Sequence, residues 1–213
     1  FADVPKLTLI ACGTSCYATM VAKYWFESMA RIPVEIDVAS EFRYRDAPLP
    51  EGGVAVFLSQ SGETMDTLEA LKLCKQQGQR ILSIVNVPDS SVARESDVVL
   101  QTLAGPEIGV ASTKAFTTQL VVLACLVITA AKQCGKLDAQ TEAILGQAIT
   151  EVPSRAVEVL HHDDHIHALA QDMFKARDAL YLGRGTGYPI AMEGALKLKE
   201  ISYIQAEGYP AGE

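Results

Sequence analysis

The sequence has little positive charge. Its 213 residues include 18 Lys and Arg against 26 Asp and Glu, which gives a formal net charge of -8 at pH 7. Nucleic acids and anionic membranes attract proteins mainly through a positive field, and no basic stripe offsets the overall acidity here. We therefore exclude nucleic acid and the membrane surface as the main partners.

The sequence also lacks a long apolar run. The longest one, residues 120–128, is extended only by the weakly apolar segment 129–131. A helix that spans a bilayer needs about 20 predominantly apolar residues. This run is therefore expected to form a core or interface helix, and we expect no membrane anchor.

Cysteine is present, but not in a pattern that indicates disulfides or a metal site. The five cysteines are Cys12, Cys16, Cys74, Cys125 and Cys134. An odd number of cysteines, most of them inside apolar segments, indicates reduced and buried thiols, as in cytoplasmic proteins. The Cys12–Cys16 spacing has no second pair and is weak evidence for a metal site.

The sequence does contain a regular alternation of apolar strands and helices. Strands are expected at residues 7–11, 34–39, 54–58, 80–86 and 97–103, and the main helices at 14–30, 64–77 and 112–132. The unbroken apolar run at 54–58 indicates a strand buried on both faces, as in parallel sheets. We predict an α/β fold, a three-layer α-β-α sandwich with a parallel, flavodoxin-like sheet.

The loop after the 54–58 strand is the most informative polar segment. Its Ser59, Gln60, Ser61 and Thr64 offer hydroxyl and amide groups at a helix N-terminus, where the helix dipole favours an anion. The GxxxxGK[ST] pattern is absent, which removes the main support for a nucleotide site. From the residues alone, an ordinary helix cap is the alternative to a phosphate cradle.

Other loops are expected at the same edge of the sheet. The βα loops of a parallel sheet meet at the carboxyl ends of the strands, so Ser15 is expected to approach the 59–64 loop. The glycine-containing segment 105–114 is long for a connection and precedes the apolar helix. Its length favours a functional loop over a plain connection.

Residues 138–176 have a different character, with helices that carry polar faces. The helix at 139–160 is expected to be interrupted at Pro153. All four histidines lie within residues 161–167, and His161 and His165 have a spacing that can ligate a metal on a helix. Neighbouring helical residues point in different directions, so we favour a solvated helix start and predict no metal.

A second strand–turn–helix unit follows. An apolar strand at 179–182 leads through a glycine turn at 183–187 into a helix, but the third glycine of a dinucleotide-binding pattern is missing. On this helix Glu193, Lys197 and Glu200 are spaced by four and three residues and share one face. They form either a surface salt-bridge ladder or, beside a sugar, an acid/base pair.

Four segments together match one family. They are ACGTS at 11–15, SQSGET at 59–64, EIGVASTKAF at 107–116 and EGALKLKEISY at 193–203. The chain resembles, along essentially its whole length, the isomerase part of the glucosamine-6-phosphate synthase family, the glutamine-dependent fructose-6-phosphate aminotransferases. The resemblance implies a first SIS (sugar isomerase) domain at 1–136, a helical bridge at 137–176 and the truncated start of a second SIS domain at 177–213.

The resemblance also implies a reaction and the residues that perform it. Fructose 6-phosphate and ammonia from glutamine would give glucosamine 6-phosphate, with no cofactor. Glu200 would move a proton between the first two sugar carbons, with Lys197 as its partner. The substrate-binding residues would be Ser59, Gln60, Ser61 and Thr64 at the phosphate and Ser15, Val110 and Ser112 at the rest of the sugar.

Other parts of that family are not found in this sequence, so we expect it to be a fragment that is inactive alone. The missing parts are the glutaminase domain, a histidine donated by the neighbouring subunit, and a C-terminal tail with a lysine. The expected partners are the glutaminase domain of the parent chain and a second copy in a homodimer, in the cytoplasm. The alternatives are a phosphosugar deglycase or isomerase of the SIS family, or a non-catalytic phosphosugar-sensing module.

Overall fold

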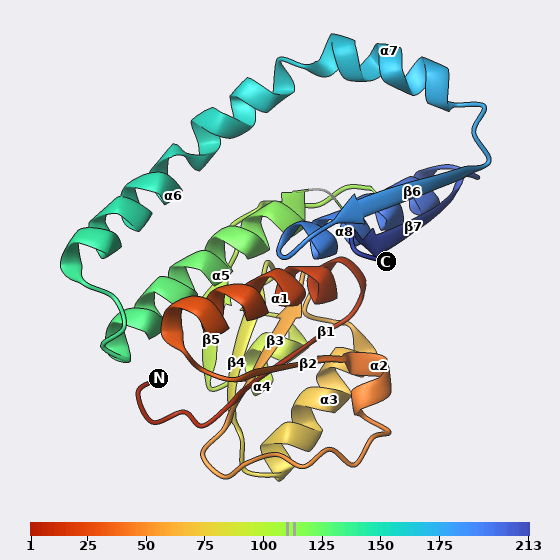
Figure 1. Cartoon of the computed structure of the whole chain (residues 1–213). Helices are drawn as coiled ribbons and strands as arrows, with labels where there is room; N and C mark the ends of the chain where they lie inside the picture. Colours follow the sequence, from red (N-terminus) through yellow and green to blue (C-terminus); the bar gives the residue numbers. More distant parts are fainter. Residues whose placement is uncertain (110, 113) are drawn as a thin grey trace.

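A computed structural model of the chain describes residues 1–109, 111–112 and 114–213. Its larger sheet has five parallel strands in the order β2-β1-β3-β4-β5 (Figure 1). These strands are β1 (Leu7–Ala11), β2 (Val34–Val38), β3 (Val54–Ser59), β4 (Arg80–Val85) and β5 (Val98–Gln101). This is the flavodoxin-like strand order, and it confirms the predicted fold class.

The adjacent strands β1 and β3 are buried along their full length. Leu7 of β1 aligns with Val34 of β2 on one side and with Val54 of β3 on the other. Such apolar sequences form strands that are covered by helices on both faces. Strand β5 is shorter than predicted, because Leu103 adopts a φ of 54°, which an extended strand cannot contain.

Helices cover both faces of this sheet and create two core clusters (Figure 1). On one face lie α1 (Gly13–Trp25), its continuation as the π-helix η1 (Phe26–Ala30), and α5 (Lys114–Gln133). On the other face lie α2 (Ala39–Phe42), α3 (Met65–Gln76) and α4 (Ser91–Glu95). The result is an α-β-α sandwich in which the sheet separates the two clusters.

Helix α5 contains the longest apolar run of the sequence. It begins at Lys114 rather than at Ser112, and its 20 residues have a mean hydropathy of 1.8. By length and composition alone such a helix could cross a membrane, so the prediction that this segment is too short to span one was wrong. Leu123 and Val127 are nevertheless buried in the core cluster beside α1, as expected of a core helix.

Two exposed helices follow, α6 (Ala139–Leu160) and α7 (Asp163–Met173). Every residue of both is described, and none is buried. Helix α6 continues through Pro153, so the predicted interruption was wrong. Proline removes one backbone donor, and the carbonyl that loses its partner on this exposed helix can bind water instead. Figure 1 shows α6 and α7 as an arc that leaves the end of α5.

The end of the chain forms a second, smaller α/β unit. Strands β6 (Asp178–Gly183) and β7 (Gln205–Pro210) pair in parallel, and α8 (Gly187–Ile201) connects them. The sequence predicts β6 and α8 but not β7, whose polar sequence QAEGYP carries no apolar alternation. Helix α8 lies beside the start of α1 (Figure 1), so the two units are in contact.

Candidate functional site

A pocket of about 240 Å³ lies at the carboxyl ends of β1 and β3. These strands are neighbours, but the chain leaves β1 toward β2 on one side of the sheet and β3 toward β4 on the other. Open α/β sheets bind ligands at such a switch point. The lining residues are Cys12, Thr14, Ser15, Leu58, Ser59, Gln60, Ser61, Thr64, Thr67, Ser112 and Ala115.

The loop after β3 is held by its own serine side chains. The Ser59 hydroxyl accepts a hydrogen bond from the Gly62 amide at 3.0 Å and lies 3.3 Å from the Thr64 hydroxyl. The Ser61 hydroxyl accepts from the Glu63 amide at 3.2 Å. Thr64 is the N-cap of α3, but its side chain makes no capping hydrogen bond. The Thr64 hydroxyl therefore does not act as a helix cap. The N-terminus of α3 faces the pocket.

The segment after β4 forms hydrogen bonds that hold the loop after β3 in place. The amides of Asn86 and Val92 donate to the carbonyls of Gln60 and Gly62 at 3.1 and 3.0 Å. The Ser91 amide donates to the Glu63 carboxylate at 2.8 Å, and this bond lowers the pKa of Glu63. These hydrogen bonds hold the loop in its pocket-facing shape, and a loop that is fixed in this way loses less entropy on binding a ligand.

The other side of the pocket comes from α1 and from the segment before α5. Gln119 of α5 donates from Nε2 to the Ser15 hydroxyl at 2.9 Å, and both side chains are buried. The Ser112 hydroxyl is buried and has no hydrogen-bond partner among the described residues. A buried hydroxyl in this state is available to a ligand. Val110, the remaining predicted contact, lies outside the described residues.

The structure therefore brings together six of the seven predicted substrate-binding residues around one pocket. They are Ser15, Ser59, Gln60, Ser61, Thr64 and Ser112. Thr14 also lines the pocket but is not among the residues predicted from the sequence. Its signal was its place in the ACGTS segment, directly before Ser15.

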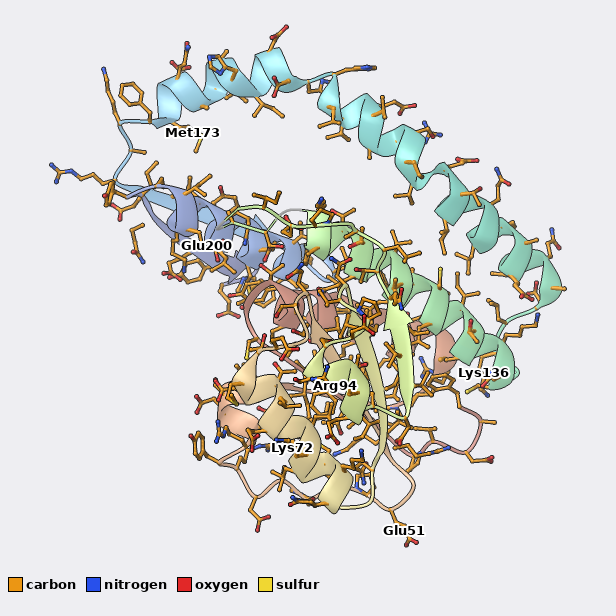
Figure 2. The ribbon with its side chains drawn as sticks, turned by 180° about the vertical axis from the view of Figure 1, so that it is seen from behind. Glu51, Lys72, Arg94, Lys136, Met173 and Glu200 are labelled. Atoms are coloured by element: carbon orange, nitrogen blue, oxygen red, sulfur yellow. The ribbon has the colours of Figure 1, made fainter. Side chains whose placement is uncertain are left out.

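The predicted acid/base pair lies together on α8, outside the residues that line the pocket. The Lys197 ammonium is 2.5 Å from the Glu200 carboxylate and 3.6 Å from that of Glu193. Glu200, labelled in Figure 2, is near the C-terminal end of α8. At a rise of about 1.5 Å per residue, it lies about 10 Å further along the helix than Glu193.

Glu193 links this pair to the pocket. It is only 6% exposed, and its carboxylate accepts a hydrogen bond from the pocket residue Thr14 at 3.1 Å. Burial raises the pKa of Glu193, while Lys197 and the Thr14 hydrogen bond oppose that change. The spacing in the sequence predicts that Glu193 shares a helix face with Lys197 and Glu200, but no catalytic role was predicted for Glu193.

This set of groups suits an anionic ligand that undergoes proton transfer. Hydroxyls, an amide side chain and a helix N-terminus can bind a phosphate without a lysine or arginine in the lining. A carboxylate that contacts an ammonium group can accept and return a proton. Among the described residues, no group of three His, Cys, Asp or Glu side chains is placed to hold a metal ion.

The sequence pattern of one family, the SIS domain, matches residues 1–129 and 172–213. Among curated proteins, the chain is 58% identical over 213 residues to a glutamine–fructose-6-phosphate aminotransferase (isomerizing) of Bradyrhizobium diazoefficiens. It is 58% identical over 212 residues to the protein of the same name from Gluconobacter oxydans. All of this chain is covered in both comparisons, but only 35% of each relative. The chain thus spans about a third of the length of these relatives.

Solved structures share this architecture. The C-terminal domain of glucosamine-fructose-6-phosphate aminotransferase from Francisella tularensis superposes with a TM-score of 0.97 at 47% identity. That match covers 99% of this chain and 60% of the other. A glucosamine-6-phosphate deaminase from Thermotoga maritima superposes with a TM-score of 0.73 at 23% identity, over 99% of this chain and 62% of the other. At that identity the second match supports the fold alone.

Proposed function

Because the chain belongs to the SIS domain family, we propose that it forms the isomerase part of a glutamine-dependent fructose-6-phosphate aminotransferase. The 58% identity to proteins of that name supports this assignment. The observation that carries it is the pocket at the β1/β3 switch point, lined by hydroxyl groups and a helix N-terminus. That lining suits the phosphate and hydroxyl groups of a sugar phosphate.

In this proposal the pocket binds fructose 6-phosphate in its open-chain form. Ser59, Ser61 and Thr64 hold the phosphate together with the backbone of the loop, and Gln60 adds its amide side chain. Ser15, Ser112 and Val110 contact the sugar. The neutral donors of the loop stabilise the phosphate without moving, because the segment after β4 already fixes their positions.

The proposed chemistry centres on the transfer of one carbon-bound proton. Ammonia condenses with the C2 carbonyl to give an imine and water. Glu200 then removes a proton from C1 while the imine nitrogen takes a proton from solvent, which gives the enolamine. Glu200 returns its proton to C2, and the C1 hydroxyl releases its own proton to solvent as C1 becomes the aldehyde of glucosamine 6-phosphate. Lys197 stays beside Glu200, 2.5 Å from its carboxylate, and holds that carboxylate in place as the base.

The proposal extends to the organisation of the parent protein. Residues 1–136 form the first SIS domain, 137–176 the bridge and 177–213 the start of the second SIS domain. The relatives are about three times longer, which leaves room for a glutaminase domain and for the rest of the second SIS domain. We place the protein in the cytoplasm as a homodimer that supplies amino-sugar precursors, including those of UDP-N-acetylglucosamine.

The test is a product assay on the complete polypeptide that contains this chain. Fructose 6-phosphate and glutamine should give glucosamine 6-phosphate, and Glu200→Gln should remove most of that activity. Lys199→Gln, on the same helix, is the matched control and should leave the activity unchanged. Release of a sugar phosphate from an amino-acid conjugate without glutamine use would instead favour a deglycase. Binding without turnover would favour a sensing module.

A further inference from the structure

The buried carboxylate of Glu193 lies where the two α/β units meet. The residue belongs to α8, yet its Oε1 atom accepts a hydrogen bond from Thr14 in the first turn of α1, 179 residues earlier in the chain. The same oxygen is 3.6 Å from the Lys197 ammonium. A carboxylate that is 6% exposed loses most of its hydration, so contacts of this kind are needed to keep it in place.

A continuous polar path runs through this carboxylate. It begins at Thr14, which lines the pocket, passes through Glu193 to Lys197, and ends at Glu200, 2.5 Å from the Lys197 ammonium. Glu200 is not among the residues that line the pocket. The hydrogen bond from Thr14 to Glu193 therefore connects the pocket lining to the acid/base pair.

Packing alone does not explain a carboxylate at this position. A buried ion pair is commonly replaced by apolar side chains of similar volume without loss of stability. The second oxygen of Glu193, Oε2, is buried and has no hydrogen-bond partner among the described residues. A purely structural carboxyl group is usually fully hydrogen-bonded, so Glu193 is kept at this position at a cost in stability.

We propose that Glu193 is a positioning residue, which holds Lys197 and Glu200 in register with the sugar-phosphate pocket through its contact with Thr14. The proposal rests on the function proposed above. Glu193 fixes the ammonium group from one side, and Lys197 in turn orients Glu200 toward the bound sugar. The role is separate from substrate binding, because Glu193 is not among the residues that line the pocket.

The role predicts a specific kinetic signature in the complete polypeptide. Glu193→Gln keeps the shape of the side chain but removes its charge, and a misplaced acid/base group can cost about 100-fold in rate. We expect kcat for glucosamine 6-phosphate formation to fall by about 10- to 100-fold and KM for fructose 6-phosphate to stay within about twofold. Lys199→Gln, which removes an exposed ion pair of the same helix with Glu207, is the matched control.

Thr14→Val provides a second test that leaves α8 unchanged. It removes the hydroxyl that contacts Glu193, so kcat should again fall. In the double variant the two losses should not add, because both changes break the same connection. This pair of variants keeps the proposal testable even if Glu193→Gln folds poorly.

Three outcomes contradict the proposal, and they point to different errors. A kcat in Glu193→Gln within twofold of the unsubstituted protein, or a loss that appears only in KM, would overturn the positioning role and leave the proposed function intact. Fully additive losses in the double variant would overturn the path through Thr14. If the unsubstituted polypeptide forms no glucosamine 6-phosphate, the proposed function itself fails and the positioning role fails with it.

Discussion

The Thr14 hydroxyl on α1 donates a hydrogen bond of 3.1 Å to the buried Glu193 carboxylate on α8. This contact joins the first turn after β1 to the helix that carries Lys197 and Glu200. Thr14 also lines the pocket at the carboxyl ends of β1 and β3. The relationship therefore connects the larger sheet, which forms the pocket, with the smaller unit, which carries the candidate acid/base pair.

The first prediction concerns the pH dependence of stability. Burial raises the pKa of Glu193 in the folded state, so the folded protein binds this proton more tightly than the unfolded chain does. The resulting stabilisation is present below the unfolded pKa and is lost as the pH rises through the folded pKa. The Glu193→Gln variant cannot ionise at this position, so its melting temperature should rise relative to that of the unsubstituted protein as the pH increases. If the difference between the two melting temperatures stayed constant over the acid range, this account would be contradicted.

The second prediction concerns Gly62 in the loop after β3. Gly62 has a φ of 65°, and a Cβ atom there would overlap the buried Ser90 side chain. Gly62→Ala should therefore cost about 3 kcal/mol of unfolding free energy and weaken phosphosugar binding. Gly78→Ala is the matched control, because Gly78 has a φ of 75° but open space around it. Its cost should be only about 1 kcal/mol, and equal costs for the two variants would contradict the proposed overlap.

The third prediction concerns local stability. Helices α6 and α7 contain no buried residue, whereas every residue of β3 is buried. Backbone amides in α6 and α7 should therefore exchange with deuterium at a lower opening free energy than those of β3. Pro153→Ala should slow exchange in α6, because it restores a backbone donor inside the helix. Equal protection of the amides in α6 and in β3 would contradict this prediction.

The fourth prediction concerns the cysteines, all five of which are described and are free thiols. The sequence predicts buried thiols, but Cys125 is exposed. Burial raises the pKa of Cys16 to about 11 and that of Cys74 to about 12, so neither is a thiolate near neutral pH. A thiol reagent should label Cys125 well before these two, as mass spectrometry of digested protein can show. Early labelling of Cys74 would indicate that α3 opens readily.

The sequence predicted the fold well where a local pattern determines the structure. Apolar runs such as residues 54–58 produced the right strands, and their alternation with helices produced the right sheet class. The interruption predicted at Pro153 was wrong, because an exposed helix can accommodate the loss of one backbone hydrogen bond at a proline. Strand β7 was missed because its polar sequence carries no apolar alternation, and its parallel pairing with β6 is visible only in the folded chain.

The site was predictable only in part, for a similar reason. The polar loop at 59–64 marks one end of the pocket from local sequence alone, and the sheet topology brings Ser15 to it. The hydrogen bonds from Gln119 to Ser15 and from Thr14 to Glu193 join residues 104 and 179 positions apart. Patterns of residue spacing within a helix or strand cannot predict contacts between residues this far apart in the sequence. These hydrogen-bond partners are therefore visible only in the folded chain.

The most direct test of the account is a calorimetric titration of this chain with fructose 6-phosphate and glucosamine 6-phosphate. The same titration on Ser59→Ala/Ser61→Ala/Thr64→Ala tests the pocket residues. Ser28→Ala/Thr129→Ala/Ser154→Ala is the matched control, since it removes three exposed hydroxyls outside the pocket. The account predicts saturable heat for the unsubstituted chain and the control, and none for the pocket variant. Equal heat in the pocket variant, or none in a well-folded unsubstituted chain, would contradict the assignment of the phosphate site.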